Sequence, residues 1–301
     1  MGLTLVGDFC QLAPVKAPYA FTSQEWHRYV DHTCLLTEIK RQDDPEFVRA
    51  LQAVRRGDAT RALEFFGPRL VQQTDMQYDG STLFAKNDPV TRYNIQRLEQ
   101  LSTPVVSFAS TRWGKLRSEW GGPPKPPDKW GIPPHISLKD GALVMILANK
   151  RIDDSMRMCY VNGDLGEFLG EEDGRARLRL RRTGEEVMVE PITRFHLTPL
   201  EPGRRKELVA EGHADRIKDK MEIIGGITYM PLRVAYASTV HKTQGLTLDA
   251  VQVNIRDHFF RSYGMLYVAL RCRTADGLRL VGDARGFVDR CRVDPQVREW
   301  V

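Results

Sequence analysis

Cysteine is scarce in this chain, and the few cysteines lie far apart. The 301 residues include five cysteines, and no two of them form a Cys-x-x-Cys pair. This spacing argues against a zinc ribbon and a disulfide scaffold, and it is typical of a reducing compartment. The sequence therefore predicts no metal-binding residues. The five are Cys10, Cys34, Cys159, Cys272 and Cys291.

Long apolar runs and targeting signals are missing as well. No stretch of about 18 apolar residues occurs, so no membrane-spanning helix is predicted. The first residues also lack the pattern of a signal peptide. We expect a soluble protein of the cytoplasm, associated with the nucleoid if the source is bacterial, with no membrane among its partners.

A third absence concerns nucleotides. The chain has no Gly-x-x-x-x-Gly-Lys-[Ser/Thr] motif, the glycine-rich loop whose backbone N–H groups surround phosphates. Its one Gly-Lys pair, Gly114-Lys115, lacks the leading glycine, and no Asp-Glu pair is present to hold magnesium. The printed sequence therefore supplies no device that captures a nucleoside triphosphate.

The composition is that of a folded protein, and it does not decide which kind of partner the protein binds. A length of 301 residues suits about two domains, and 42% hydrophobic residues are enough for real cores. The net charge of +5 and the pI of about 8.9 permit an anionic partner. Acidic residues are interspersed, however, and no basic tail stands out.

Residues 231–249, PLRVAYASTVHKTQGLTLD, carry the strongest local pattern. The apolar, β-branched run 234–240 is typical of a buried parallel strand, and a polar turn containing Gly245 follows it. In open α/β sheets, ligands bind at the carboxyl ends of the strands. Side chains in this turn are therefore suited to phosphate or to nucleic-acid backbone, with an ordinary strand-to-helix connection as the alternative.

Short apolar runs alternate with helix signals elsewhere in the chain. The strand expected at 3–6 lies so close to Met1 that its sheet neighbours are expected from an amino-terminal part preceding this sequence. Asp44-Pro45 and Asp88-Pro89 each predict the start of a helix, with Asp as the cap and Pro in the first turn. Further strands are predicted at 34–39, 82–85, 251–255 and 278–282, and a further helix at 264–274.

The middle of the chain has a different character. Residues 112–134 hold three tryptophans among basic residues, which predicts a long insertion loop. Such a loop either stacks bases and holds phosphates or packs its tryptophans on a neighbour. Residues 143–191 predict a small all-β module of short strands, and 203–222 an exposed helix or linker.

Several segments, in order along the chain, resemble motifs of superfamily 1 DNA helicases of the petite-integration-frequency (PIF-type) and RecD-like branch. They are LTLVGDFCQLAPV, YAFTSQEW, LTEIKRQDDPEFVRAL, DGALVMILANK with YVNGDLGEFLG, PLRVAYASTVHKTQGLTLDAV and GMLYVALRCRTADGL. The resemblance implies an α/β fold of the P-loop NTPase type, a RecA-like motor domain without its P-loop, with an inserted small Src-homology-type β-barrel. The implied parts are the tail of a first motor domain (1–39), a second motor domain (40–137 and 228–301), and the barrel with a linker (138–227).

The resemblance also implies roles for particular residues. Gln11 would sense the γ-phosphate of ATP, while Arg41 and Arg271 would be catalytic arginines that reach this phosphate. The residues implied at the nucleotide are Gly7, Asp8, Gln11, Arg41, Gln244, Gly245 and Arg271. Those implied at nucleic acid are His241, Lys242, Thr243 and Asn87. ATP and Mg²⁺ are the implied cofactors, both only together with the amino-terminal half.

The sixth motif departs from the family pattern. The family has Tyr-Val-Ala-Leu-Ser-Arg, whereas here Leu270 is followed directly by Arg271. One residue changes the facing on a helix by about 100°. Arg271 and Arg273 therefore both remain candidates for the arginine of this motif.

We expect the carboxy-terminal part of an ATP-dependent helicase that moves along single-stranded DNA, 5′ to 3′ by resemblance, and unwinds duplex. Such enzymes serve DNA replication, repair and recombination. The alternative is a non-catalytic nucleic-acid-binding remnant, or a half-motor that needs an amino-terminal partner chain.

Overall fold

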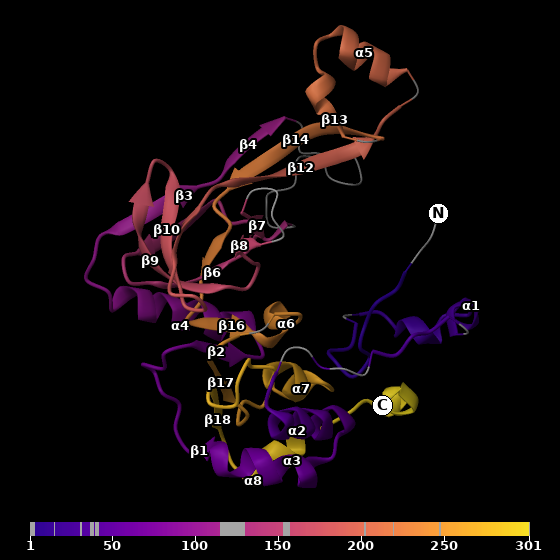
Figure 1. The fold of residues 1–301 in the computed structure, drawn as a ribbon, viewed down its shortest axis with the longest axis vertical. Helices are drawn as coiled ribbons and strands as arrows, with labels where there is room; N and C mark the ends of the chain where they lie inside the picture. Colours follow the sequence, from indigo (N-terminus) through magenta and orange to yellow (C-terminus); the bar gives the residue numbers. More distant parts are fainter. Residues whose placement is uncertain are drawn as a thin grey trace. The chain divides into compact units, whose positions relative to one another are not determined.

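The computed structural model describes most of the chain as two compact units. The described residues are 4–14, 16–30, 32–36, 39, 42–114, 130–152, 157–201, 203–218, 220–246 and 248–300. Unit 1 comprises Met1–Arg97 and Ala235–Val301, and unit 2 is Leu98–Val234. Unit 2 is therefore one continuous insertion, and it begins earlier in the chain than the insertion predicted at 138–227. Figure 1 shows the two units, each with its own sheets.

Unit 1 is built on a five-stranded sheet in which all neighbours are parallel. The order is β1-β18-β17-β2-β16. The strands are β1 (Leu70–Val71), β2 (Ser81–Phe84), β16 (Ala237–Thr239), β17 (Val251–Asn254) and β18 (Leu278–Val281). The three inner strands are largely buried, as expected when helices cover both faces of a parallel sheet. The strands predicted at 82–85, 251–255 and 278–282 are confirmed to within a residue or so.

Helix α2 (Pro45–Arg56) begins and ends where local sequence signals place it, and α4 (Asn87–Glu99) begins one residue before the predicted cap Asp88. Asp44 accepts a hydrogen bond from the Glu46 N–H at the start of α2, and Gly57 ends this helix in the left-handed conformation. The apolar face of α2 is buried and includes Phe47, whose ring packs 6.2 Å from that of Phe66 in α3. The helices are η1 (Ala20–Thr22), α1 (His27–Val30), α2 (Pro45–Arg56), α3 (Ala59–Phe66), η2 (Gly67–Arg69), α4 (Asn87–Glu99), α6 (Val240–Thr243), α7 (Met265–Ala269), α8 (Ala284–Arg290) and η5 (Pro295–Trp300).

Unit 2 consists mainly of antiparallel sheets. Its five-stranded sheet has the order β11-β10-β9-β6-β15. In β10 the residues Ala176, Leu178 and Leu180 are fully buried, which confirms the half-buried strand that the arginine alternation indicates. These strands are β6 (Leu143–Ile146), β9 (Leu165–Glu172), β10 (Arg175–Leu180), β11 (Glu186–Val189) and β15 (Leu232–Val234).

A second sheet of unit 2 has β14 at its centre. Strand β14 (Met221–Tyr229) pairs with β12 (Ile192–Pro199), β13 (Ile217–Lys218) and β4 (Thr111–Gly114). Two hairpin-like pairs complete the described strands, β3 (Val105–Ala109) with β5 (His135–Lys139) and β7 (Lys150–Arg151) with β8 (Met158–Tyr160). Helix α5 spans Arg204–Ala210 and η4 spans Ala214–Arg216. Pairing does not close the five-stranded sheet, which ends at β11 and β15, so the inserted barrel remains a prediction.

Several predictions about local structure are wrong. The described residues of 3–6 and 34–39 form no strand, and Leu5, Val6, Leu35 and Leu36 are exposed. An apolar run becomes a strand only beside another strand, and the described part of the chain pairs none with them. The helix predicted at 264–274 ends at Ala269, and the loop predicted at 112–134 begins as strand β4.

The stretch 231–249 also divides differently from the prediction. Its single expected strand is two strands that belong to different units, the antiparallel β15 and the parallel β16. The expected polar turn begins with the short helix α6, which starts directly after β16. No helix of the described residues is long and apolar enough to span a membrane.

Candidate functional site

The candidate site of unit 1 begins with the loop that contains Asp8 and Gln11. One carboxylate oxygen of Asp8 accepts a hydrogen bond from the backbone N–H of Cys10 at 3.1 Å. The other accepts from Nε2 of Gln11 at 3.2 Å, and the Gln11 N–H donates to the Asp8 carbonyl. Asp8 therefore shapes this loop and orients the amide of Gln11.

Arg55 holds the same carboxylate from the last turn of α2. Its Nη2 lies 3.2 Å from Oδ1 of Asp8, and both side chains are only about a fifth exposed. Burial lowers the pKa of the Arg55 guanidinium, but Asp8, Cys10 and Tyr267 together outweigh it, so the net pKa is raised. Arg55 was missed from the sequence, because Arg-Arg before a helix-ending glycine is common on surfaces. Arg55 could have been found by asking which cation pairs with Asp8, because a partly buried carboxylate usually has a cationic partner.

Gln11 and Gln244 are brought together although 233 residues separate them. Nε2 of Gln244 donates to Oε1 of Gln11 at 3.4 Å. Gln244 follows α6, and Gly245 beside it adopts a left-handed φ of 84°. The third and fifth resemblance motifs therefore meet in unit 1 through two amide side chains, each able to donate to a phosphate and to accept from water.

Gly264 permits the close approach of α7 to the Asp8–Gln11 loop. It precedes the helix with a φ of 70°, and a Cβ at this position would lie 2.3 Å from the Gln11 carbonyl oxygen. Any side chain here would force the loop away from α7. Gly264 is a second residue that the sequence analysis missed.

The structure separates the two candidate arginines of the sixth motif. Arg273 Nε lies 2.5 Å from Oδ1 of Asp249, so its charge is already paired. Arg271 is half-buried, and its Nη1 is fully buried without a hydrogen-bond partner. Buried polar groups are normally hydrogen-bonded, so Nη1 of Arg271 is an unsatisfied donor, and its role at a ligand stays a prediction.

Tyr267 lies among the charges of this site. The guanidinium carbon of Arg271 lies 5.7 Å from its ring centroid. Burial raises the pKa of the Tyr267 hydroxyl, and the negative charge of Asp8 adds to this, while Arg271 and Arg55 oppose it. Tyr267 therefore remains a neutral phenol. It interacts with both Asp8 and Arg271.

Gln42 connects the fourth motif to the sixth. Its side chain is 6% exposed, and its Nε2 donates to the Cys272 carbonyl at 2.9 Å. This contact was also missed, because it joins residues 230 positions apart. Arg41, the predicted catalytic arginine directly before Gln42, lies outside the described residues. Gly7, predicted at the nucleotide, is near the start of the Asp8 loop and has open space around its Cα.

The residues predicted at nucleic acid differ in accessibility. His241 and Lys242 are exposed on α6, and Asn87 is exposed as the first residue of α4. Thr243 is buried, and its hydroxyl donates to the Val240 carbonyl at 2.9 Å. Because β2 and β16 are parallel neighbours, the segments that follow them, with Asn87 and α6, lie at one edge of the sheet.

Asn94 of α4 fixes the edge strand that leads into α6. Its side-chain oxygen accepts from the Ala237 N–H at 2.8 Å, and its nitrogen donates to the Ala237 carbonyl at 3.0 Å. The amide thus replaces the missing neighbour of an edge strand. This positions the start of α6, and with it His241 and Lys242.

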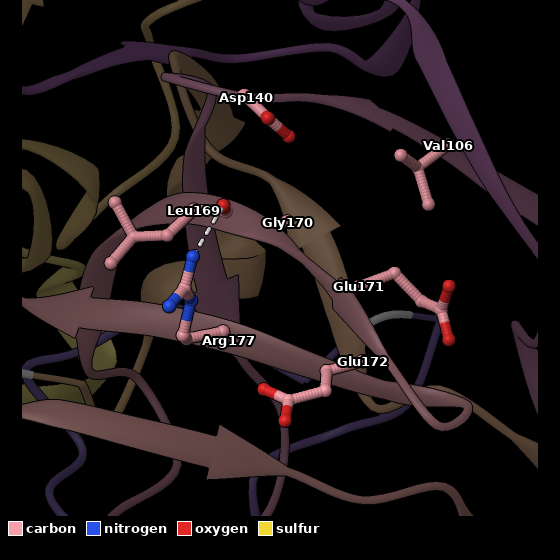
Figure 2. Close-up of a pocket in the computed structure, with 7 residues that line it drawn as sticks. All are labelled: Val106, Asp140, Leu169, Gly170, Glu171, Glu172 and Arg177. Carbon is pink, nitrogen blue, oxygen red and sulfur yellow. Dashed lines mark hydrogen bonds between the residues drawn. The ribbon is translucent and has the colours of Figure 1, made fainter.

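A shallow pocket of about 470 Å³ lies in unit 2 and contains none of these residues (Figure 2). Three carboxylates line it, and Nη2 of its one arginine, Arg177, donates to the Leu169 carbonyl at 3.5 Å. Such a lining repels phosphate, so we assign the pocket no role. Its residues are Val106, Asp140, Leu169, Gly170, Glu171, Glu172 and Arg177. No group of three or more metal-ligating side chains gathers among the described residues.

A five-stranded parallel sheet covered by helices, with polar side chains at its carboxyl edge, defines unit 1 as an α/β domain of the RecA-like motor type. The family described as AAA domain matches residues 1–69. The Pif1 helicase structure from Candida albicans has a TM-score of 0.65 at 25% identity, over 98% of this chain and 66% of that one. Unliganded Pif1 from Bacteroides sp. gives 0.66 at 24% identity, over 88% and 55%.

Sequence comparisons agree with the structures. The ATP-dependent DNA helicases PIF1 of Homo sapiens and Xenopus laevis are 30% and 29% identical to this chain. They match 98% and 93% of it, and 42% and 40% of their own lengths. Pif1 of Campylobacter jejuni is 28% identical over 89% of this chain and 60% of its own. The chain is thus homologous to Pif1-type superfamily 1 helicases over nearly its whole length, and it spans about half the length of these relatives.

Proposed function

We propose that this chain supplies the second motor domain of an ATP-dependent, Pif1-type DNA helicase. Gln11, Gln244 and Arg271 are the groups that would contact the γ-phosphate. His241, Lys242 and Asn87 are those that would hold single-stranded DNA. The names of the relatives support this proposal, because they are ATP-dependent DNA helicases.

One observation carries the proposal most directly, the contact between Gln11 and Gln244. It joins the loop tied to Arg55 with the segment that follows α6. A change at phosphate would therefore reach Gln244, two residues after Lys242 in the chain, through the hydrogen bond from Gln244 to Gln11. Such a connection is what a motor needs to convert hydrolysis into movement along DNA.

The residues present suit one side of an ATP site. Gln11 and Gln244 offer amide donors, and Arg271 offers a partly buried guanidinium with a vacant Nη1. ATP would supply the phosphoryl group whose transfer builds charge on the γ-phosphate oxygens, and positive groups stabilise that charge. Magnesium and the remaining phosphates need ligands that this sequence does not contain, so ATP and Mg²⁺ bind only with a phosphate-loop domain.

The finer aspects of the function are proposals too. We infer movement along single-stranded DNA in the 5′-to-3′ direction, unwinding of duplex, and service in replication, repair or recombination, in the cytoplasm or at the nucleoid. One solved Bacteroides Pif1 structure is described as a complex with ADP-AlF3 and single-stranded DNA, which supports the choice of ligands. The Thr239 hydroxyl accepts a hydrogen bond from the Lys242 N–H at 3.3 Å, which fixes the turn that carries His241 and Lys242.

The absence of a phosphate loop from the printed sequence leaves a second candidate open. In that case the chain is a nucleic-acid-binding remnant without catalysis, or a half-motor that acts only with another chain. Both candidates require single-stranded DNA binding, and they differ in ATP hydrolysis.

Two measurements test the proposal. Fluorescence anisotropy of a labelled 20-mer of thymidine should show binding that weakens steeply between low and moderate salt, because phosphate contacts release counterions. Failure to bind at low salt contradicts both candidates. Phosphate release with Mg-ATP and saturating DNA should stay below about 0.1 per second for the chain alone. Fusion to the part of the Campylobacter jejuni relative that this chain does not match should raise it, and a fusion that stays inactive favours the remnant.

A further inference from the structure

One face of the second sheet in unit 2 carries a row of aromatic side chains across three strands. The register pairs Trp113 of β4 with Gly226 of β14, and Gly226 with Phe195 of β12. Directly paired residues in antiparallel strands point to the same face. Trp113 and Phe195 are 41% and 39% exposed, so both rings are accessible on that face.

Gly226 is the residue that lets the two rings meet. A Cβ at this position would lie 3.0–3.1 Å from three atoms of the Trp113 indole, so the indole lies across the glycine. It contacts the Phe195 ring edge to face, with 6.2 Å between centroids and 75° between planes. The glycine therefore builds a continuous aromatic surface in place of two isolated side chains.

The next row on the same face is polar. Two residues further along each strand, Thr111, Thr228 and Thr193 are paired in the same way. The hydroxyls of Thr193 and Thr228 lie 2.8 Å apart in a hydrogen bond. The face therefore combines exposed rings with hydroxyl groups and carries no aliphatic ridge along these two rows.

The charges of this sheet suit an anionic ligand. Its strands carry three exposed cations, Arg112, Arg194 and Lys218, against one carboxylate, Glu222. Arg112 and Arg194 are paired through Ile227 and therefore lie on the opposite face from the aromatic row, where they add to the positive charge of the sheet but not to that face. Glu222 is neutralised by Arg204, at 3.4 Å. Lys218 lies on the aromatic side, with its Nζ 5.9 Å from the Phe195 centroid.

We propose that this face is a binding site for single-stranded DNA, in which bases stack on Trp113 and Phe195 and Lys218 contacts a phosphate. Every base has a π-face, so rings beside a cation bind single strands with little sequence preference. The inference rests on the proposed single-strand binding and adds to it a site in the inserted unit, outside the motor site. It also gives a function to the first of the tryptophans in the region predicted as a loop.

The test is a titration of the full chain with the labelled thymidine 20-mer. Trp113→Leu and Phe195→Leu remove a ring but keep an apolar side chain, and each should weaken binding roughly 5- to 100-fold. Trp113→Phe and Phe195→Tyr keep a ring and should stay within about threefold of the parent. Tyr29→Leu removes a similarly exposed ring from unit 1 and should change nothing.

Tryptophan emission supplies a readout of stacking itself. Adding unlabelled thymidine 20-mer should quench the emission of the parent, and the quenching should shrink in Trp113→Phe although affinity is nearly kept. This pair of measurements needs only conservative variants, so it decides the question even if a leucine variant fails to fold. Unchanged quenching in Trp113→Phe overturns the proposal.

The remaining outcomes separate this inference from the proposed function. A parent that does not bind the 20-mer at low salt overturns both. A parent that binds, with leucine variants of equal affinity, overturns the stacking site alone. An equal loss of DNA affinity in Tyr29→Leu would also overturn the stacking site. If Trp113→Leu instead dissociates a dimer in sedimentation while DNA affinity is unchanged, a second copy of the chain covers this face and the inference is wrong.

Discussion

Unit 1 and unit 2 place their candidate functional side chains on their sheets in opposite ways. In unit 1 these side chains stand in loops and at helix starts that follow the strands, as Asn87 and His241 do. In unit 2 the exposed rings of Trp113 and Phe195 stand on the strands themselves. A parallel sheet is covered on both faces, so only its edges remain for ligands, whereas an antiparallel sheet keeps an open face.

This difference decides how visible each site is in the sequence. A loop at a strand end concentrates its polar residues, so HKTQG at 241–245 forms a compact pattern. A strand face takes alternate residues from several distant strands, so Trp113, Phe195 and Gly226 form no local pattern at all. In this protein the candidate residues of unit 2 are therefore recognised only from the strand register in the structure. The candidate residues of unit 1 are recognised from sequence motifs. The predictions below test this division.

The largest expected effect belongs to Arg271. In the fusion with the unmatched part of the Campylobacter jejuni relative, Arg271→Ala should lower ATP turnover by roughly 10³-fold or more, as for other arginines that stabilise phosphoryl transfer. Arg41→Ala should act in the same way. Phosphate release measures the rate. Arg273→Ala is the matched control, because Arg273 is already paired with Asp249, and an equal loss there would contradict the assignment.

Gly264→Ala should destabilise unit 1 by roughly 2–4 kcal/mol, because the new Cβ collides with the Gln11 carbonyl and the positive φ adds strain. Urea unfolding measures the free energy. Gly174→Ala has a similar φ of 76° but open space around it, so it should cost only about 1 kcal/mol. Equal losses in the two variants would mean that the contact between loop and α7 contributes nothing.

Arg55→Ala should cost about 1–3 kcal/mol of unfolding free energy, because it leaves the half-buried Asp8 carboxylate without its cation. The double variant Arg55→Ala with Asp8→Asn should recover part of this loss. Urea unfolding of the four proteins forms a double-mutant cycle. A coupling free energy near zero would remove Arg55 from the site.

Alkaline pH should destabilise unit 1 through its buried thiols. Burial raises the pKa of Cys291 from 9.0 to about 12. The unfolded chain therefore loses this proton near pH 9 while the folded chain keeps it. The contribution of this thiol to the free energy of unfolding is fully present below pH 9, and it is lost by about 1.4 kcal/mol per pH unit as the pH rises toward 12.

Urea unfolding at pH 8 and pH 10 measures this slope, which should be smaller in Cys291→Ala. Cys272, whose pKa burial raises to about 11, contributes in the same direction. Cys34→Ala, at an exposed cysteine, is the control and should leave the slope unchanged. A slope that is the same in Cys291→Ala would show that another group titrates.

The smallest effect is expected at Lys242. Lys242→Ala should weaken single-strand binding a few-fold and reduce the slope of log affinity against log salt by about 1, as expected for one phosphate contact. Anisotropy at several salt concentrations gives both values. Lys206→Ala removes another exposed lysine, from α5 of unit 2, and an identical change there would show that only net charge matters.

Much of the local structure was predictable because local interactions determine it. Asp44, Pro45 and Gly57 delimit α2 through capping and glycine geometry alone. The arginine alternation of β10 and the apolar runs of β17 and β18 likewise need no information from elsewhere. The runs at 3–6 and 34–39 were predicted wrongly, because a strand requires a pairing partner that the run itself does not specify.

The sequence by itself determined which residue types are available for the chemistry: the amides of Gln11 and Gln244, the arginines after Leu270, and the basic turn after β16. Tertiary structure alone decided which of them meet. The Asp8–Arg55 pair, the Arg273–Asp249 pair and the Trp113–Phe195 row all join residues distant in the chain. Such contacts depend on strand order and helix packing, which bring atoms within a few ångströms only after the whole unit has folded.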